Sequence, residues 1–185
     1  ILKNPLANAG NDLSICESGF AQLSGLTENT IDVLWISDGD GTFDDNTSAT
    51  AIYYPGEADI ANETVSLCLT AFADGSCQDV QDCTVLNIEK APLADAGWDK
   101  LICETESYQL DGNAQNFASV YWETNGDGTF DEPANLTPVY YPGEDDIETG
   151  FAELELTAYA GANCEEATDN MILSIDKTPV ANAGN

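Results

Sequence analysis

The sequence predicts an all-β fold made of two tandem β-sandwich domains with about seven strands each. Three observations lead to this prediction. A segment of 87 residues, 5–91, occurs again as 92–178. Within each copy, short runs alternate apolar and polar residues, which is the period of a half-buried strand. Turn residues separate these runs at intervals of about 8–12 residues, and no stretch carries the apolar stripe of a helix.

The repeat sets the expected domain boundaries. PLANAG at 5–10 returns as PLADAG at 92–97 and as PVANAG at 179–184, and both spacings are 87 residues (92 − 5 and 179 − 92). The copies 5–91 and 92–178 align without a gap, with 39 of 87 positions identical. We expect one domain in each copy, the end of a preceding copy at 1–4 and the start of a following copy at 179–185, as in an excerpt from a longer array.

Strands are expected in the first copy wherever the alternation is clear. In Thr64–Phe72, the apolar residues Val65, Leu67, Leu69 and Ala71 fall on one face. Trp35 and its counterpart Trp122 are expected in the core, because a tryptophan in the middle of a strand fills the space between two sheets. The other expected strands of this copy are 22–26, 31–36, 50–54 and 84–88.

The six cysteines favour an oxidising, extracellular compartment, because no Cys-x-x-Cys pair marks a zinc or redox site. Cys16 and Cys77 recur as Cys103 and Cys164, so the simplest pairing is one bond in each copy, Cys16–Cys77 and Cys103–Cys164. Cys68 and Cys83 occur in the first copy alone, where both fall on the outward face of neighbouring strands. We expect a third bond, Cys68–Cys83; the alternative is two free thiols.

The connection between the copies contains no flexible Gly/Ser tract. The segment 88–93 passes from the last strand of one copy into the first strand of the next, and Pro92 biases Ala91 toward an extended conformation. A stiff joint between neighbouring repeats is therefore expected. Trp98 follows this joint, and it either packs between the domains or is an exposed or intradomain aromatic residue.

Charge and composition exclude several classes of function. The chain has 34 acidic residues against 4 basic ones, a formal net charge of −30, and no histidine. All four basic residues are lysines, so the chain lacks the arginine fork that binds phosphate, and a nucleic acid would be repelled. No apolar run approaches the roughly 20 residues that span a bilayer, so no membrane insertion is expected.

The strongest candidate site is a calcium site on an acidic, glycine-containing loop. Carboxylate and amide oxygens are the ligands that calcium prefers. The alternative is structural, because Asp and Gly are turn residues and an Asp side chain often accepts hydrogen bonds from nearby backbone amides. The candidate ligands are Asp38, Asp40, Asp44 and Asp45 in the first copy, and Asn125, Asp127, Asp131 and Glu132 in the second.

A secondary acidic set follows the YYPG segment of each copy, and further acids lie near the domain joints. Either group would complete a calcium shell or form a solvated acidic rim. The secondary candidates are Glu57, Asp59 and Asp12 in the first copy and Glu144, Asp145, Asp146 and Asp99 in the second. The high acidity of each copy also predicts self-repulsion, which added cations would relieve.

Several segments together resemble a known family. They are ANAG-x-D at 7–12, DAGWD at 95–99, the Trp35 and Trp122 blocks ending in GDGTF, YYPGE-x-DI and the LxLTA strands. This combination resembles the PKD-like, immunoglobulin-fold repeats of giant surface proteins of the Bacteroidota, best known from gliding-motility adhesins. The resemblance implies a monomeric, non-catalytic stalk at the cell surface that presents adhesive regions located elsewhere in the parent protein.

The alternative function is a ligand- or carbohydrate-binding accessory module of a secreted hydrolase. Surface aromatic residues would carry it, and the repeated pairs Tyr53/Tyr54 and Tyr140/Tyr141 each have one member expected to face outward, unless it packs under the following Pro-Gly loop. Catalysis is not expected, because the sequence contains no Gly-x-Ser-x-Gly elbow, no Cys–His pair and no glycine-rich phosphate loop.

Overall fold

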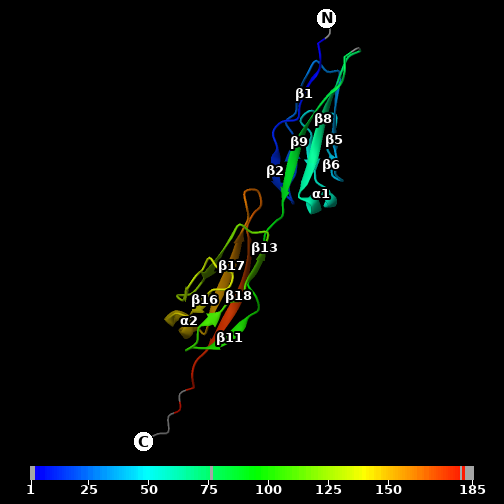
Figure 1. Cartoon of the computed structure of the whole chain (residues 1–185). Coiled ribbons are helices and arrows are strands. Elements are labelled where there is room, and N and C mark those ends of the chain that lie inside the picture. The colour runs from blue at the N-terminus through cyan, green and yellow to red at the C-terminus, as the bar shows by residue number, and fades with distance from the viewer. Residues whose placement is uncertain (1–2, 76, 180, 182–185) are drawn as a thin grey trace. The chain divides into compact units, whose positions relative to one another are not determined.

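The structure is a computed structural model that describes residues 3–75, 77–179 and 181 (Figure 1). The chain divides into two compact units, Ile1–Lys90 and Ala91–Asn185, one residue before the boundary expected from the repeat. Nearly all of the regular secondary structure in each unit is strand, as predicted. The expectation of neighbouring copies at both ends rests partly on residues 1–2, 180 and 182–185, which lie outside the described part.

Unit 1 contains nine strands and one short helix among its described residues. The longest strands are the central hairpin, in which alternate residues are buried. The elements are β1 (Leu6–Asn8), β2 (Leu13–Cys16), β3 (Ala21–Gln22), β4 (Leu26–Glu28), β5 (Asp32–Ser37), β6 (Thr42–Phe43), β7 (Ile52–Tyr54), α1 (Glu57–Asn62), β8 (Thr64–Phe72) and β9 (Val80–Glu89).

Unit 2 repeats the same order of elements. Its bounds follow those of unit 1 closely, as expected from two copies of one sequence pattern. The elements are β10 (Leu93–Asp95), β11 (Lys100–Cys103), β12 (Tyr108–Gln109), β13 (Asn113–Gln115), β14 (Ser119–Thr124), β15 (Thr129–Phe130), β16 (Val139–Tyr141), α2 (Glu144–Thr149), β17 (Phe151–Tyr159) and β18 (Ala167–Asp176).

Each unit is a sandwich. In unit 1, the four-stranded sheet β2-β9-β8-β5 lies opposite the three-stranded sheet β3-β7-β6 and the ribbon β1-β4. Unit 2 has the matching sheets β11-β18-β17-β14, β12-β16-β15 and β10-β13. Most neighbours are antiparallel, but the edge strand β2 pairs with the last strand β9 in parallel, and β11 pairs with β18 in the same way.

The core lies between the layers. Trp35 on β5 and Tyr53 on β7 are fully buried together with the inward residues of β8, as the period-two pattern predicted. Trp122 and Tyr140 occupy the same places in unit 2. The indole Nε1 of Trp35 donates to the Ala49 carbonyl at 3.3 Å, so the polar end of this buried ring is satisfied.

Two details differ from the sequence-based expectation. The helices α1 and α2 were not predicted, because six residues make fewer than two turns and are too few to show a 3.6-residue period. The run 22–26 is not one strand. It divides into β3 and β4, and between them the amides of Leu23 and Gly25 donate to the carbonyls of Ala51 and Ala49.

Candidate functional site

The acidic residues nearest the Gly-Asp-Gly loop of unit 1 form a buried hydrogen-bond network centred on Asp59. Asp59 lies in the first turn of α1 and is only 1% exposed. Its carboxylate accepts a hydrogen bond of 2.6 Å from the Tyr53 hydroxyl. It also accepts bonds from the backbone amides of Asp40, Gly41 and Gly56 at 3.1–3.2 Å. Four donors therefore compensate the buried charge.

Asp40 completes the arrangement from the other side. Its carboxylate accepts hydrogen bonds from the amides of Ala58 and Asp59, at 3.1 Å and 3.2 Å, which are otherwise unpaired amides of the first turn of α1. The loop carboxylate therefore holds the helix, and the helix carboxylate holds the loop. We call this reciprocal pair, Asp40 with Asp59 in unit 1, the carboxylate lock.

Unit 2 contains the same carboxylate lock, formed by Asp127 and Asp146. Asp146 is 2% exposed and accepts bonds from the Tyr140 hydroxyl at 2.6 Å and from the amides of Gly128 and Gly143 at 3.1 and 3.0 Å. Asp127 accepts from the amides of Asp145 and Asp146 at 3.1 and 3.2 Å.

The lock explains the glycine that precedes the aspartate in each Gly-Asp-Gly segment. A Cβ atom on Gly39 would overlap the carboxylate of Asp59, and one on Gly126 would overlap that of Asp146. The backbone must approach the buried carboxylate this closely for the amides that follow to donate to it. Glycine is required here for space rather than for an unusual φ angle.

The two tyrosines of the lock titrate at unusually high pH. Burial first, and then the hydrogen bond to Asp59, raise the pKa of Tyr53 from 10.0 to about 12. Burial and the bond to Asp146 raise the pKa of Tyr140 in the same way. For Asp127, partial desolvation favours a higher pKa, but the amides of Asp145 and Asp146 stabilise the charged form and the net effect lowers the pKa.

The other predicted ligands also act as hydrogen-bond acceptors within their own unit. In unit 1, Asp38 accepts from the Ser66 amide at 2.8 Å, and Asp44 accepts from the Ile52 amide at 2.7 Å. Asp45 accepts from both the amide and the hydroxyl of Thr47, and the hydroxyl bond first, then the amide bond, lower its pKa. Asp12 accepts from the Val85 amide at 2.9 Å.

The equivalent residues of unit 2 have matching roles. Asn125 accepts from the Glu153 amide at 3.0 Å, and Asp131 from the Val139 amide at 2.8 Å. Asp99 accepts from the Ile172 amide at 2.8 Å. Glu132 accepts from the Asn135 side chain at 3.4 Å. Most of these side chains therefore accept hydrogen bonds from backbone amides, and Glu132 accepts one from a side chain.

The structure brings some of the predicted calcium ligands together without forming a ligand cluster. Asn125, Asp127, Asp145 and Asp146 line a pocket of ≈ 320 Å³ in unit 2. Within the described residues, however, no three acidic or cysteine side chains converge in a geometry that would hold a metal ion. Glu57 and Glu144 lie exposed in the first turns of α1 and α2. Calcium binding stays a prediction.

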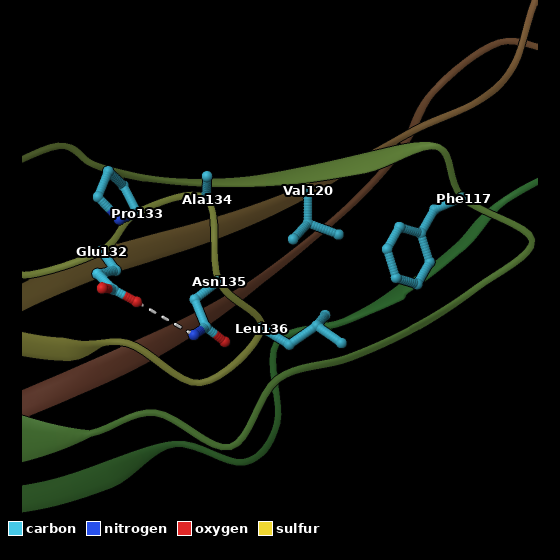
Figure 2. A pocket seen from close by; sticks show the side chains of 7 residues that line it. All are labelled: Phe117, Val120, Glu132, Pro133, Ala134, Asn135 and Leu136. Atoms are coloured by element: carbon cyan, nitrogen blue, oxygen red, sulfur yellow. Dashed lines mark hydrogen bonds between the residues drawn. The ribbon is translucent and has the colours of Figure 1, made fainter.

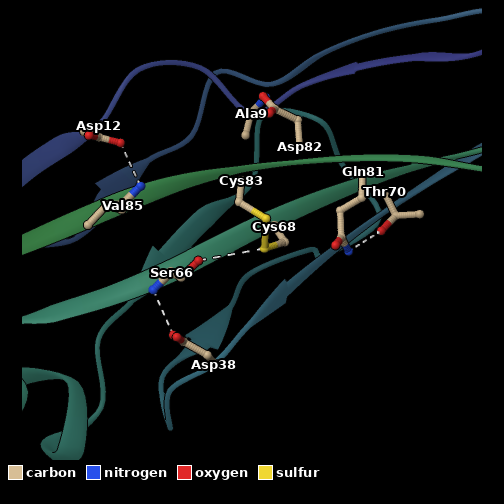
Figure 3. The surroundings of a disulfide bond; sticks show 10 residues. All are labelled: Ala9, Asp12, Asp38, Ser66, Cys68, Thr70, Gln81, Asp82, Cys83 and Val85. Carbon is tan, nitrogen blue, oxygen red and sulfur yellow. Dashed lines mark hydrogen bonds between the residues drawn. A yellow bond between two sulfur atoms is a disulfide. The ribbon is translucent and has the colours of Figure 1, made fainter.

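The predicted bond between Cys68 and Cys83 is confirmed (Figure 3). The two residues are direct partners in the β8–β9 register. Their side chains lie on the outer face of the sheet, beside Ser66 and among the polar residues Thr70 and Gln81 (Figure 3). Unit 2 places Glu155 opposite Asn170 at this position.

The predicted bonds Cys16–Cys77 and Cys103–Cys164 are wrong, because Cys77 and Cys103 are free thiols. The parallel edge strand explains the error. In the strand register, Cys16 lies opposite Glu89 at the end of β9, whereas Cys77 precedes the start of β9 at Val80. Ten residues of strand span about 33 Å, far beyond the reach of a disulfide. Cys103 and Cys164 lie at opposite ends of β18 for the same reason.

The tyrosine pairs divide as predicted. Tyr53 and Tyr140 are buried in the carboxylate lock, whereas Tyr54 and Tyr141 are 45% and 49% exposed. Trp98 is 86% exposed and belongs to a polar pocket of unit 2 that the sequence did not indicate as a site. The signal available in the sequence was the replacement of Asn11 by tryptophan at the matching position of the second copy.

A more apolar pocket of ≈ 520 Å³ lies elsewhere on unit 2 (Figure 2). Phe117, Val120 and Leu136 line it, and Glu132 reaches Asn135 along one side (Figure 2). Unit 1 has the smaller or more polar residues Thr30 and Ala49 in place of Phe117 and Leu136, so this pocket does not belong to the repeated pattern.

No family model matches this chain, and no curated protein matches it. Solved structures do resemble it. Extracellular domains 3–5 of Drosophila OTK superpose with a TM-score of 0.55 at 14% identity, covering 94% of this chain and 60% of that chain. The insect immune protein hemolin superposes with a TM-score of 0.55 at 10% identity, covering 93% of this chain and 47% of that chain. A titin I-band fragment superposes with a TM-score of 0.57 at 10% identity, covering 96% of this chain and 67% of that chain.

These comparisons show the fold: both units are immunoglobulin-like β-sandwiches in tandem. The chain spans between 39% and 60% of the length of the first three similar structures. No helix within the described residues is both long enough and apolar enough to span a membrane.

Proposed function

We propose that the two units are non-catalytic, load-bearing stalk repeats of a large bacterial cell-surface adhesin, exported to the extracellular space and linked to further copies of the same repeat. The neighbouring repeats are then the direct partners, and the main adhesive regions for a surface or glycan lie elsewhere in the parent protein. The sequence resemblance supports the bacterial origin, and the repeated immunoglobulin-like fold supports a structural role.

The observation that carries the proposal is the parallel pairing of the edge strand with the last strand in each unit. In unit 1, Leu13, Ser14, Ile15 and Cys16 of β2 lie opposite residues 86–89 of β9. The chain enters before β2 and leaves after β9, so a pull on the two ends of the unit draws these strands in opposite directions along their length. The hydrogen bonds between them are then loaded in shear and must break together.

The contacts around this strand pair strengthen it. The Glu17 amide donates to the Glu89 carbonyl at 2.8 Å, beyond the last paired residue of β2. The Thr84 hydroxyl donates to the Asn11 carbonyl at 2.8 Å, and the Asn87 side chain donates to the Leu13 carbonyl at 3.2 Å. Two side-chain hydrogen bonds from β9 therefore supplement the backbone hydrogen bonds between β2 and β9.

Single-molecule force spectroscopy of the full chain, pulled from its two ends under reducing conditions, tests the proposal. Because hydrogen bonding alternates along a strand, Ile15 shares the orientation of Glu17 and its amide faces β9. The Ile15→Pro variant should lower the unfolding force of one of the two events. Ser14→Pro is the matched control, since the Ser14 amide faces away from β9 on an edge strand that tolerates proline.

A second control separates mechanical resistance from ordinary stability. Asp59→Asn alters the carboxylate lock without touching β2 or β9, so it should lower equilibrium stability while leaving the unfolding force nearly unchanged. Equal losses of force in Ile15→Pro, Ser14→Pro and Asp59→Asn would show that the β2–β9 pair does not bear the load, and the proposal would fail.

A further inference from the structure

The exposed Trp98 lies at a polar pocket of unit 2. The pocket has a volume of ≈ 440 Å³, within the range of roughly 300–1,000 Å³ usual for small-molecule sites. Trp98 is 86% exposed, the most exposed large apolar side chain among the described residues. Asp95, Lys100, Tyr108, Asp111 and Asn113 also line the pocket.

The fold brings the polar groups of this pocket together. Asp95 ends β10 and lies directly opposite Asn113 in the β10–β13 pair. Asp111 lies two residues before Asn113, and its carbonyl would lie 3.4 Å from a Cβ on Gly97, next to Trp98. Tyr108 lies close enough to Asp111 that burial, followed by this negative charge, raises the pKa of Tyr108. One aromatic face is therefore bordered by two carboxylates, an amide, a phenol and an ammonium.

The backbone around the pocket is fixed by hydrogen bonds. The Ala96 amide donates to Asp169 on β18 at 2.8 Å, and the Gly97 amide donates to Asp95 at 3.0 Å. On the other side of Trp98, Asp99 accepts from the Ile172 amide. Trp98 thus projects from a segment whose two flanks are both tied to the unit, so its exposure does not reflect a loose turn.

Unit 1 provides an internal comparison. Subtracting 87 places Asn8, Asn11, Leu13, Ala21, Ser24 and Leu26 at the positions of the six pocket residues. The aromatic platform, both carboxylates, the lysine and the phenol are all absent there. The pocket is therefore not part of what the repeated scaffold needs in order to fold.

We propose that this pocket binds a neutral pyranose, with Trp98 stacked on one face of the sugar ring and the surrounding polar groups bonded to its hydroxyls. A sugar ring offers an apolar face of C–H groups and a rim of hydroxyls that both donate and accept. Carboxylates and an amide at the edge of an indole match both features. An anionic sugar is disfavoured, because two carboxylates border the pocket and the chain carries a net charge of −30.

The stacking geometry favours a gluco-configured ring. When every ring hydroxyl is equatorial, the C–H groups on each face lie axial and form a flat apolar surface for the indole. An axial hydroxyl, as at C2 of mannose, interrupts that surface. This inference does not depend on the load-bearing proposal, since it concerns residues outside the β2–β9 and β11–β18 strand pairs except Lys100 at the start of β11.

The three tryptophans make the experiment selective. Trp35 and Trp122 are buried and their indole N–H groups donate to carbonyls at 3.3 and 3.2 Å, whereas Trp98 is exposed. In a titration of the full ¹⁵N-labelled chain with cellohexaose at millimolar concentrations, we expect the Trp98 indole N–H resonance to shift and the other two to stay. Mannohexaose should give a shift several-fold smaller at the same concentration.

Variants then test the assignment. Trp98→Ala should weaken cellohexaose binding at least tenfold, measured by calorimetry or by the amide shifts of residues 95–113, and Asp111→Asn should weaken it several-fold. Tyr121→Ala removes another exposed aromatic of unit 2, 41% exposed on β14, and should bind as the parent chain does.

Three outcomes would overturn the proposal. They are no shift of the Trp98 resonance with cellohexaose, equal shifts with cellohexaose and mannohexaose, or binding that persists in Trp98→Ala. Loss of binding in Trp98→Ala with unchanged unfolding forces would support the site independently of the mechanical role.

Discussion

At the scale of single residues, most of the aspartates proposed as metal ligands from the sequence accept hydrogen bonds from backbone amides. Asp59 shows this most clearly, because four donors surround a carboxylate that is 1% exposed. A buried charge of this kind stabilises the fold only while its donors are in place. The carboxylate lock therefore fixes the Gly-Asp-Gly loop to the helix in each unit.

The Asp59→Asn variant tests this role. The amide keeps the shape of the side chain but loses the charge and turns an N–H group toward other N–H donors. We expect a loss of about 2–4 kcal/mol in the free energy of unfolding of unit 1, measured by urea denaturation. Glu57→Gln, in the same helical turn but exposed, is the matched control and should change it by less than about 0.5 kcal/mol. Similar effects from both variants would contradict the lock.

The lock also predicts alkaline sensitivity. Folding raises the pKa of Tyr53 from 10.0 to about 12, first through burial and then through the bond to Asp59, so the folded state holds this proton more tightly than the unfolded chain. The resulting stability is complete below pH 10 and is lost as the pH rises from 10 toward 12.

Urea midpoints measured across this range should therefore fall with pH. Tyrosinate absorbance should show late-titrating groups from both Tyr53 and Tyr140, and Tyr53→Phe should remove one of them. Tyr54→Phe changes the exposed neighbour and is the control. If Tyr53→Phe retains the full alkaline loss of stability in unit 1, ionisation of Tyr53 is not its cause.

At the scale of elements, the equivalent hairpins β8–β9 and β17–β18 have different residue pairs at one matching position of the outer face. Cys68 and Cys83 are bonded in unit 1, and Glu155 and Asn170 face each other in unit 2. Glu123 on β14 also lies directly opposite Glu155, which places two like charges side by side. The outer face of the sheet is thus joined by a disulfide in unit 1, whereas in unit 2 it places two like charges opposite each other.

Exchange of these pairs tests the brace. The bond closes a sequence separation of 15 residues, for which chain entropy predicts about 3 kcal/mol. Cys68→Glu with Cys83→Asn should lower the unfolding free energy of unit 1 by about 2–3 kcal/mol, measured in urea. Glu155→Cys with Asn170→Cys should raise that of unit 2 by a similar amount, because the register is the same.

Glu155→Ser with Asn170→Ser is the control for this exchange, since it removes the like-charge pair without adding a bond. A gain in this control as large as in the cysteine variant would assign the effect to charge relief rather than to the disulfide.

At the scale of the whole chain, self-repulsion is the dominant electrostatic feature. There are 34 acids against 4 lysines, so most acids have no lysine to pair with; Lys90 pairs with Glu63 at 2.8 Å. The chain should therefore be stabilised by any cation that screens its surface.

We expect the melting temperature to rise with NaCl, by about 4–8 °C for each 1 kcal/mol of repulsion relieved per unit. The calcium hypothesis predicts an additional rise in CaCl₂ at matched ionic strength, reversed by a chelator. Equal melting temperatures in the two salts would contradict the calcium hypothesis. A melting temperature that depends on neither salt would contradict the repulsion argument.

Much of the fold could be predicted because strand pattern and repetition are local signals. The alternation of Val65, Leu67 and Leu69 fixed the inward face of β8, and the loss of Cys68 and Cys83 together in the second copy indicated their bond. The helix α1 was missed because it is too short to show a period. The bond Cys16–Cys77 was wrong because only the parallel register of β2 reveals that the two residues lie at opposite ends of β9.

The sequence by itself determined the number of units, their sandwich character, the buried tryptophans and the excess of negative charge, because these depend on composition and on contacts between near neighbours. The tertiary structure alone decided which backbone amides the carboxylates accept hydrogen bonds from. The partners of an aspartate depend on which donors the fold places around it, and for Asp59 these come from residues 3 to 19 positions away in the chain.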